Sequence, residues 1–359
     1  MTTLHLRNSI SRSPLRRGCL LIAFALCCFA LSPPAQASST YWTDTSGDWF
    51  TAANWDNGGP PGVPTCSLDA YINNAGSAQI NSSGATALTL NLGRNSVDSG
   101  TVSVTNSGTL LVQGCPSAPI RGPITVGYQG TGKLSITSGG NVASGSGYIA
   151  ASTSVSATSN GSVTVDGANA NGNSTWHIGD LNTLHSVLFV GGNENGDGGT
   201  ALLSITNGGS VTVQDNGNET SATVGPSGTV TGNGTLDTSS SKFQQLTDVK
   251  GTLAPNWTLT IGGNLSLESS ATMQCNVTPQ NLGSVDVSVS ATATLQTHSH
   301  LSVTMTGTFT PGQQFTLLHT ASGVNGTFGS YSITYSPVPT YTPVITYDAN
   351  NVYLYLRPN

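Results

Sequence analysis

A strand-like alternation that recurs along most of the chain constrains its fold more than any other feature. It is clearest in the segments SGTVSVTNSGTLLVQG (99–114), GTGKLSITSGGNVAS (130–144), SNGSVTVDGAN (159–169) and GGTALLSITNGGSVTVQD (198–215). Each holds one or two runs in which Val, Leu or Ile alternates with Thr or Ser, broken by Gly, Asn or Asp. A period of two is that of a half-buried strand between turns. Because no segment shows a helical apolar stripe, the sequence predicts an all-β fold.

The spacing of these segments predicts a solenoid and not a sandwich. They recur about every 30 to 40 residues, which is the range of stacked repeat proteins. Their apolar side chains are few per strand and mostly of medium size, which suits coils that bury their faces on their neighbours. The 44 glycines can supply the corners between faces. Only 7% of residues are charged, a composition that also occurs in disordered chains, but the regular apolar spacing favours a folded one.

The first 37 residues read as an export signal. Their basic residues are Arg7, Arg12, Arg16 and Arg17. An apolar run from Leu20 to Leu31 and the small-residue site Ala35-Gln36-Ala37 follow, so we expect cleavage before Ser38. The run is about 12 residues long, whereas a bilayer span needs roughly 20. A short membrane anchor and a twin-arginine signal are the alternatives.

Removal of the leader makes the chain more acidic. Six basic residues then remain against sixteen acidic ones, a net charge near −10. Such a surface repels nucleic acid and anionic lipid. We therefore expect no nucleic-acid partner, and we expect no integral membrane segment in the mature chain.

Three cysteines lie in the leader, and Cys66, Cys115 and Cys275 follow it. Their spacing matches no zinc motif, and an odd number in an exported chain allows one intramolecular bridge. We favour a Cys66–Cys115 disulfide. Cys275 is then expected to be a small buried apolar residue.

The segment WTDTSGDWFTAANWDNGGPPGVP (42–64) holds three of the five tryptophans. Trp42, Trp49 and Trp55 precede the first repeat, where a stacked fold needs a cap over its apolar interior and unpaired strand edge. We expect the three rings to be buried as an N-terminal cap. The alternative is an exposed aromatic platform, which would make these tryptophans ligand-binding residues for a polysaccharide.

One loop has the pattern of a calcium site. In GGNENGDGGT (191–200), Asn193, Asn195 and Asp197 occupy alternate positions before Gly198, as oxygen ligands do in short calcium loops. The twelfth position is Ser204, where a bidentate Glu would be wanted. A Ca²⁺ site and a plain glycine-rich loop are both open, and the plain loop is favoured.

Motifs of catalysis are scarce. The chain has no G-x-S-x-G elbow, HExxH, Walker loop or dinucleotide fingerprint. The acids of the repeat region stand mostly beside Gly or Asn, where turn capping accounts for them. His298 and His300 are predicted to face outward while Leu301, Val303 and Met305 face inward, and no third metal ligand accompanies the two imidazoles. We expect no catalytic residues and no resident cofactor.

Four segments resemble the passenger domains of autotransporters. They are GTLAPNWTLTIGGNLSLESSATMQCNV (251–277), TFTPGQQFTLLHTASGVNGTFGSYS (308–332), YDANNVYLYL (347–356) and the head GDWFTAANWDNGGPPGVP (47–64). The resemblance implies a right-handed parallel β-helix. It divides the chain into a signal peptide (1–37), a cap with the first coils (38–98), β-solenoid repeats (99–245) and a passenger-like C-terminal β segment (246–359).

The sequence departs from that family after Leu356, because only three residues follow. A translocator barrel needs at least eight strands of about 10 residues, so we expect the barrel to be missing. Export beyond the periplasm would then need separate secretion machinery.

The function expected from these features is passive. We predict an exported, non-enzymatic structural or adhesive module, extracellular or at the outer cell surface, with the periplasm as the alternative. Faces rich in Thr, Ser and Asn would bind glycans or surface proteins. The alternative function is a polysaccharide-binding or polysaccharide-degrading β-helix.

Overall fold

The computed structural model describes most of the chain after the predicted leader. The described residues are 38–58, 62–115, 122–152, 159–167, 172–179, 186–193, 195–214, 221–241, 245–287, 291–336 and 341–359. They belong to one compact unit, Ala37–Asn359. The predicted signal peptide, and Glu194 within the calcium-like loop, lie outside the described residues. The described residues are all-β, as predicted, with 61% of them in strands and 1% in helix. Their helical turn is the 3₁₀ segment η1 (Ala52–Asn54).

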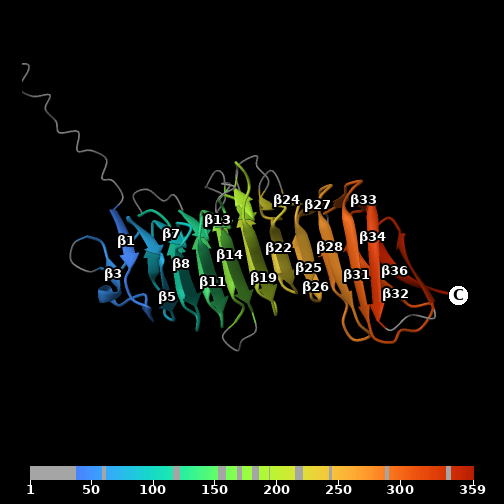
Figure 1. Cartoon of the computed structure of the whole chain (residues 1–359), viewed down its shortest axis with the longest axis horizontal. Coiled ribbons are helices and arrows are strands. Elements are labelled where there is room, and N and C mark those ends of the chain that lie inside the picture. Colours follow the sequence, from blue (N-terminus) through green and yellow to red (C-terminus); the bar gives the residue numbers. More distant parts are fainter. Residues whose placement is uncertain are drawn as a thin grey trace, which may run out of the picture. The chain divides into compact units, whose positions relative to one another are not determined.

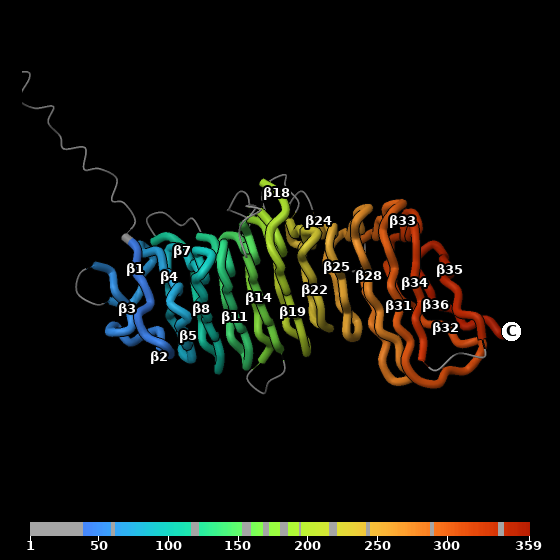
Figure 2. The backbone as a smooth tube through the Cα atoms, in the orientation of Figure 1, coloured from blue at the N-terminus to red at the C-terminus, as the bar shows by residue number. Residues whose placement is uncertain are grey.

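The strands of the described residues, to which all strand counts below refer, form three long sheets, here named A, B and C. The chain visits these sheets in turn (Figure 1). From β4 to β34, successive strands belong to sheets A, B and C in rotation, apart from one small hairpin. Within a sheet, neighbours are therefore strands from successive coils, and the colour of the tube advances steadily along the stack (Figure 2). The arrangement is β-helix-like.

Sheet A has twelve strands. In spatial order they are β3 (Trp55–Asp56), β1 (Ser38–Trp42), β4 (Leu68–Ile72), β7 (Thr89–Leu92), β10 (Pro123–Val126), β13 (Ser146–Ile149), β16 (Leu188–Val190), β21 (Ala222–Val224), β24 (Leu246–Val249), β27 (Asn264–Leu267), β30 (Ala293–Leu295) and β33 (Val324–Gly326).

Sheet B has eleven strands. They are β2 (Ser46–Asp48), β5 (Asn74–Ile80), β8 (Ser99–Val104), β11 (Thr131–Thr137), β14 (Asn160–Asp166), β19 (Thr200–Thr206), β22 (Gly228–Gly232), β25 (Thr252–Pro255), β28 (Thr272–Val277), β31 (His300–Thr306) and β34 (Ser330–Ser336).

Sheet C also has eleven strands, and a two-stranded hairpin stands apart from the three sheets. The strands of sheet C are β6 (Ala85–Ala87), β9 (Thr109–Val112), β12 (Asn141–Ser144), β15 (Thr175–Gly179), β20 (Ser210–Gln214), β23 (Thr235–Asp237), β26 (Thr258–Gly262), β29 (Ser284–Val287), β32 (Gln314–Thr320), β36 (Asn351–Pro358) and β35 (Tyr341–Tyr347). The hairpin consists of β17 (Gly192–Asn193) and β18 (Gly196–Asp197).

Pairing in the three sheets is parallel except at their ends. β1 pairs with β3 antiparallel, and β36 pairs antiparallel with both β32 and β35. The coils between parallel strands differ in length. Leu253 is opposite Met273 and Val163 is opposite Leu203, so the second of these coils is twice as long as the first. The register is kept although the longer coil includes the β17–β18 hairpin, which stands apart from the three sheets.

The core is a set of aliphatic columns that run from coil to coil. One column on sheet B consists of Val102, Leu134, Val163, Leu203, Val230, Leu253, Met273 and Leu301, all fully buried and opposite one another in this order. Full burial of such a side chain stabilises a fold by about 1.5–3 kcal/mol. Because Val and Leu alternate with Thr and Ser, every second side chain of a strand points inward. There it packs against the coils above and below, and this burial stabilises the fold.

Trp176 is the largest residue inside the middle of the stack. Its side chain is fully buried, and its indole Nε1 donates a hydrogen bond to Ser144 Oγ at 3.0 Å. A Cβ atom at Gly147 would lie 2.6 Å from two carbons of this ring. Glycine at that position makes room for the indole.

Candidate functional site

The three N-terminal tryptophans lie inside the fold. Trp42, Trp49 and Trp55 are 3%, 0% and 1% exposed, and Trp55 packs edge-on against Trp42 and Trp49 with ring centroids 5.0 and 4.7 Å apart. Trp55 Nε1 donates to the carbonyl oxygen of Trp49 at 2.8 Å. A Cβ atom at Gly76 would lie 2.4 Å from Trp42 Cδ1. Buried rings cannot stack on a sugar, so the exposed tryptophan platform considered as the alternative is not present.

The calcium-like loop forms the β17–β18 hairpin. Asn193 Oδ1 accepts the backbone N–H of Asn195 at 2.8 Å, and Asn193 Nδ2 donates to the carbonyl oxygen of Ala151 at 2.6 Å. Asp197 pairs with Gly192 across the hairpin. The Asn193 side chain thus fixes the turn and ties it to the neighbouring coil. Across the described ranges, no cluster of three or more His, Cys, Asp or Glu side chains could hold a metal ion.

The positions of His300 and of the three described cysteines are explained by structural roles. His300 faces outward on β31, with Nδ1 2.9 Å from Ser330 Oγ and Nε2 3.1 Å from Ser332 Oγ. Cys66 and Cys115 form a disulfide, which is the pairing that the sequence analysis favoured. Cys275 is free and buried, and burial raises the pKa of its thiol to about 12. A thiol with that pKa is not a nucleophile at neutral pH.

The outer face of sheet A carries a row of side chains in register across eleven strands. It runs Tyr41, Tyr71, Asn91, Thr125, Tyr148, Phe189, Thr223, Asp248, Ser266, Thr294 and Asn325. Buried residues flank most of these positions along each strand, as the alternation of a half-buried strand requires. We call this set the sheet A row.

Aromatic side chains form two stacks in the sheet A row. The rings of Tyr41 and Tyr71 lie 5.1 Å apart with 18° between their planes, and those of Tyr148 and Phe189 lie 6.0 Å apart with 8° between theirs. The guanidinium of Arg94 lies 5.0 Å from the centre of the Tyr71 ring, in cation–π contact.

Two small polar residues separate the aromatic stacks. Asn91 and Thr125 occupy the row between Tyr71 and Tyr148, which are three strand spacings apart, or roughly 14 Å. Asn91 Nδ2 donates to Thr89 Oγ1 at 3.1 Å, and that hydroxyl donates to Asp69 Oδ1 at 2.7 Å. These bonds hold the amide in place. We call the stretch between Tyr71 and Tyr148 the sheet A gap.

A pair of carboxyl groups lies further along the same face. Asp248 follows Thr223 in the sheet A row, and its side chain is hydrogen-bonded to that of Glu268, just beyond β27. Ser266 Oγ donates to Glu268 Oε1 at 2.8 Å. Burial, the negative charge of Glu268 and that hydrogen bond raise the pKa of Asp248 to about 6, against a smaller opposing effect of Lys250. Asp248 therefore changes its charge close to neutral pH.

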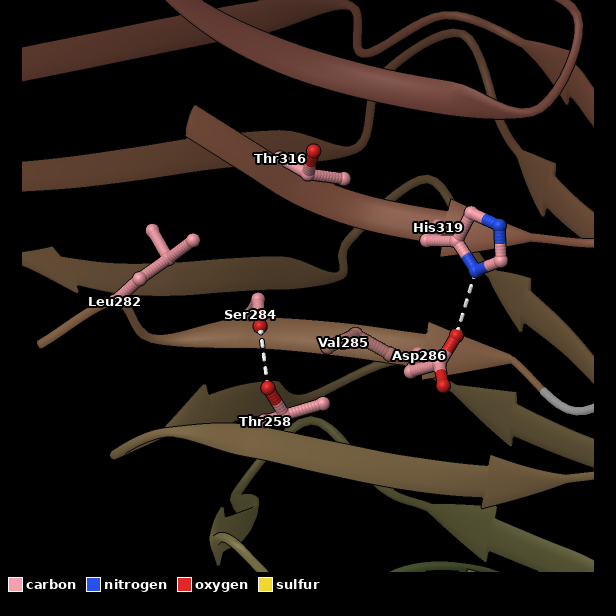
Figure 3. A pocket seen from close by; sticks show the side chains of 7 residues that line it. All are labelled: Thr258, Leu282, Ser284, Val285, Asp286, Thr316 and His319. Atoms are coloured by element: carbon pink, nitrogen blue, oxygen red, sulfur yellow. Dashed lines mark hydrogen bonds and ion pairs between the residues drawn. The ribbon is translucent and has the colours of Figure 1, made fainter. Parts of the chain in front are cut away.

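A groove of about 330 Å³ opens on sheet C, where β26, β29 and β32 lie side by side (Figure 3). Its lining residues are Thr258, Leu282, Ser284, Val285, Asp286, Thr316 and His319. His319 Nδ1 lies 2.7 Å from Asp286 Oδ1, and both side chains are about half exposed. Ser284 Oγ and Thr258 Oγ1 share a hydrogen bond of 3.1 Å.

The groove resembles part of a hydrolytic site without a placed nucleophile. Ser284 stands two residues before Asp286 on β29, about 6.6 Å along the strand. His319 is opposite Asp286 and not opposite Ser284. Since a general base must lie within hydrogen-bond reach of the group it activates, His319 is badly placed to activate this hydroxyl.

Sequence reasoning missed the two aromatic stacks and the carboxyl pair. Tyr148 and Phe189 lie on successive coils, as do Asp248 and Glu268, so only the register of the coils brings the members of each pair together. The available signal was an aromatic or acidic residue at an outward position of a strand, as in the stretches SGYI and LTDV.

The chain matches no protein-family model and no curated protein. Among the described residues, no helix has both the length and the apolar character needed to span a membrane. The choice between functions therefore rests on the surface features of the sheets.

Proposed function

We propose that the chain is an exported right-handed parallel β-helix that serves as a non-enzymatic adhesive module and binds glycans along the outer face of sheet A. The regular visiting of three sheets supports the β-helix, and crossovers between parallel strands are right-handed in nearly all proteins. The buried cluster of Trp42, Trp49 and Trp55 would cap its N-terminal end. The passenger-like C-terminal segments support export to the cell surface.

The observation that carries this proposal is the sheet A gap. Glycan sites combine aromatic faces with a few polar groups that fix orientation. Tyr148 provides an aromatic ring on one side of the gap, and Asn91 and Thr125 provide an amide and a hydroxyl along its base. A row that extends over several coils suits an extended polymer better than a small molecule.

Arg94 points to the class of glycan. Its guanidinium lies over the Tyr71 ring at the other side of the gap, and guanidinium groups bind carboxylates through paired hydrogen bonds. The chain as a whole is acidic, with a net charge of −6, so a basic group beside aromatic rings is a local exception. We expect a polymer containing uronic acids to bind more tightly than a neutral one.

Binding is measured by affinity electrophoresis of the purified protein in gels containing a uronate polymer or a neutral polymer. Tyr148→Ala and Arg94→Ala should each remove the retardation in the uronate gel while leaving the far-ultraviolet spectrum unchanged. The matched control is Trp257→Ala, because Trp257 is 54% exposed and lies outside the sheet A row. Loss of binding in Trp257→Ala alone would contradict the proposal and move the site toward sheet C.

Polysaccharide cleavage is the second candidate, and the Asp248–Glu268 pair is the observation that favours it. A pKa near 6 suits a general acid. The geometry speaks against it, since glycosidase carboxyl groups are about 5–5.5 Å or 6.5–9.5 Å apart, whereas these two are hydrogen-bonded to each other. Incubation with uronate and neutral polymers, followed by a reducing-end assay, tests it. Turnover that Asp248→Asn abolishes would establish an enzyme.

Localisation is tested by fractionating the producing cells. The proposal expects the protein in the medium or on the outer surface, where added protease reaches it. Recovery only with the cytoplasmic fraction would contradict export.

A further inference from the structure

Sheet B ends in a strand whose inward residues remain partly exposed. β34 is the last strand of this sheet, and its hydrogen-bonded neighbour among the described strands is β31 (Figure 2). Tyr331, Ile333 and Tyr335 stand opposite Leu301, Val303 and Met305, so they continue the buried columns of the core. Yet Tyr331 is 54% exposed and Tyr335 is 44% exposed. The columns thus extend to a surface that the rest of the described chain leaves partly open.

The sequence of β34 reads almost identically in both directions. Around Ile333 it is Ser-Tyr-Ser-Ile-Thr-Tyr-Ser, and the only departure from symmetry is Ser332 against Thr334. Two antiparallel copies of such a strand, related by a two-fold axis through Ile333, place Tyr331 opposite Tyr335 of the second copy. A two-fold interface requires this self-complementarity. If a residue i of one copy contacts a residue j of the second, then j of the first copy also contacts i of the second.

The edge of β34 also lacks the features that usually prevent strand pairing. Proteins protect exposed edges with Lys, Pro, inward-pointing charges or very short strands. β34 has seven residues, none charged and none proline. The hairpin strand β35 is likewise uncharged. Two copies of β34 can therefore pair without placing a charged side chain of that strand in the interface.

We propose that two copies of this chain associate through their C-terminal ends, by antiparallel pairing of β34 with β34 centred on Ile333. Sheet B then continues from one copy into the other, and Tyr331 and Tyr335 cover the two columns that each copy leaves open. This interface is independent of glycan binding, but it would join two sheet A rows in one particle and raise the avidity for a polymer.

The first test measures the mass of the purified full chain by sedimentation equilibrium at micromolar concentrations. The native protein should have twice the mass of one chain, and Ile333→Lys should have the mass of one, because it places a charge at the two-fold axis. Leu202→Lys is the matched control, since Leu202 is exposed in the middle of sheet B. A native protein that is monomeric, or that binds only a different protein, overturns the proposal. A dimer that survives in Ile333→Lys does so as well.

Cysteine cross-linking tests the register even if Ile333→Lys does not fold. Directly opposed residues in an antiparallel pair have Cα atoms about 4.5 or 5.5 Å apart, which is within the range of a disulfide. Ile333→Cys should therefore give a covalent dimer on mild oxidation. Tyr331→Cys alone should not, because its two copies would be about 13 Å apart along the strands. A mixture of Tyr331→Cys and Tyr335→Cys chains should cross-link to each other.

These measurements use the chain that begins at Ser38, without the three cysteines of the leader. Its remaining thiol does not interfere with the readout, because Cys66 and Cys115 are disulfide-bonded and Cys275 is buried. Efficient cross-linking of Tyr331→Cys alone, or none with Ile333→Cys, would overturn the two-fold register.

Discussion

The two ends of the stack treat aromatic residues in opposite ways. At the N-terminal end Trp49 and Trp55 are almost completely buried, and β3 folds back antiparallel on β1 beside them. At the C-terminal end of sheet B, Tyr331 and Tyr335 hold corresponding inward positions and remain about half exposed. Sheet C shows that the C-terminal end can also be closed, since β36 and β35 return antiparallel and bury Leu354. The aromatic rings are buried where the chain folds back antiparallel beside them, and about half exposed at the end of sheet B.

The largest expected effect is at the N-terminal end. Trp49→Ala removes a fully buried indole, and such truncations cost about 3–5 kcal/mol of unfolding free energy. Urea unfolding followed by circular dichroism measures it. The control Trp257→Ala alters an exposed indole and should stay within about 0.5 kcal/mol of the native protein. Equal losses in the two variants would mean that the N-terminal cluster contributes no special stability.

A second change at the N-terminal end tests how tightly the tryptophan cluster is packed. Gly76→Ala would place a methyl group 2.4 Å from Trp42 Cδ1, and overpacking of this kind typically costs about 1–3 kcal/mol. Ser77→Ala, at the adjacent half-buried position, is the control. If the two alanine variants melt at the same temperature, Trp42 must have room to move.

Between the two ends, the contribution of Asp248 to stability is expected to depend on pH. The raised pKa of Asp248, from 3.8 to about 6, means that the native state binds a proton more tightly than the unfolded state does. Stability from this group is therefore complete below pH 4 and is lost as the pH rises through 6. Asp248→Asn should be more stable than the native protein at pH 7.5, by on the order of 1 kcal/mol after screening by solvent.

This gain in Asp248→Asn should shrink steadily as the pH falls from 6 to 4. Thermal melts of the two proteins across this interval measure the difference. A constant difference at every pH would show that the carboxyl of Asp248 does not titrate differently in the folded and unfolded chains.

The smallest effect on a single chain is expected at the open end. Tyr331→Ser removes a ring that is about half exposed, so the unfolding free energy of the monomer should change by about 1 kcal/mol or less. Native melting should depend on protein concentration if two copies associate, and that dependence should vanish in the variant. Concentration-independent melting of the native chain would remove the contrast between the ends.

The inward residues of the core could be predicted from the sequence, but their partners could not. Strict alternation identified Leu301, Val303 and Met305 as inward, and all three are buried. Cysteine counting favoured the Cys66–Cys115 bridge that the structure contains. Which outward residues meet depends on the length of each coil, and coil length differs by a factor of two within sheet B. A local sequence pattern therefore could not predict that the Tyr148 ring stacks on the Phe189 ring.

The unequal coils have a consequence for protein engineering. The coil from Val163 to Leu203 is twice as long as the coil from Leu253 to Met273, yet both keep the strands in step. The longer coil contains the β17–β18 hairpin, whose turn at Asn195 is exposed. Foreign peptides grafted at this turn should leave the aliphatic columns intact, which would make the molecule a display scaffold with adjustable loops.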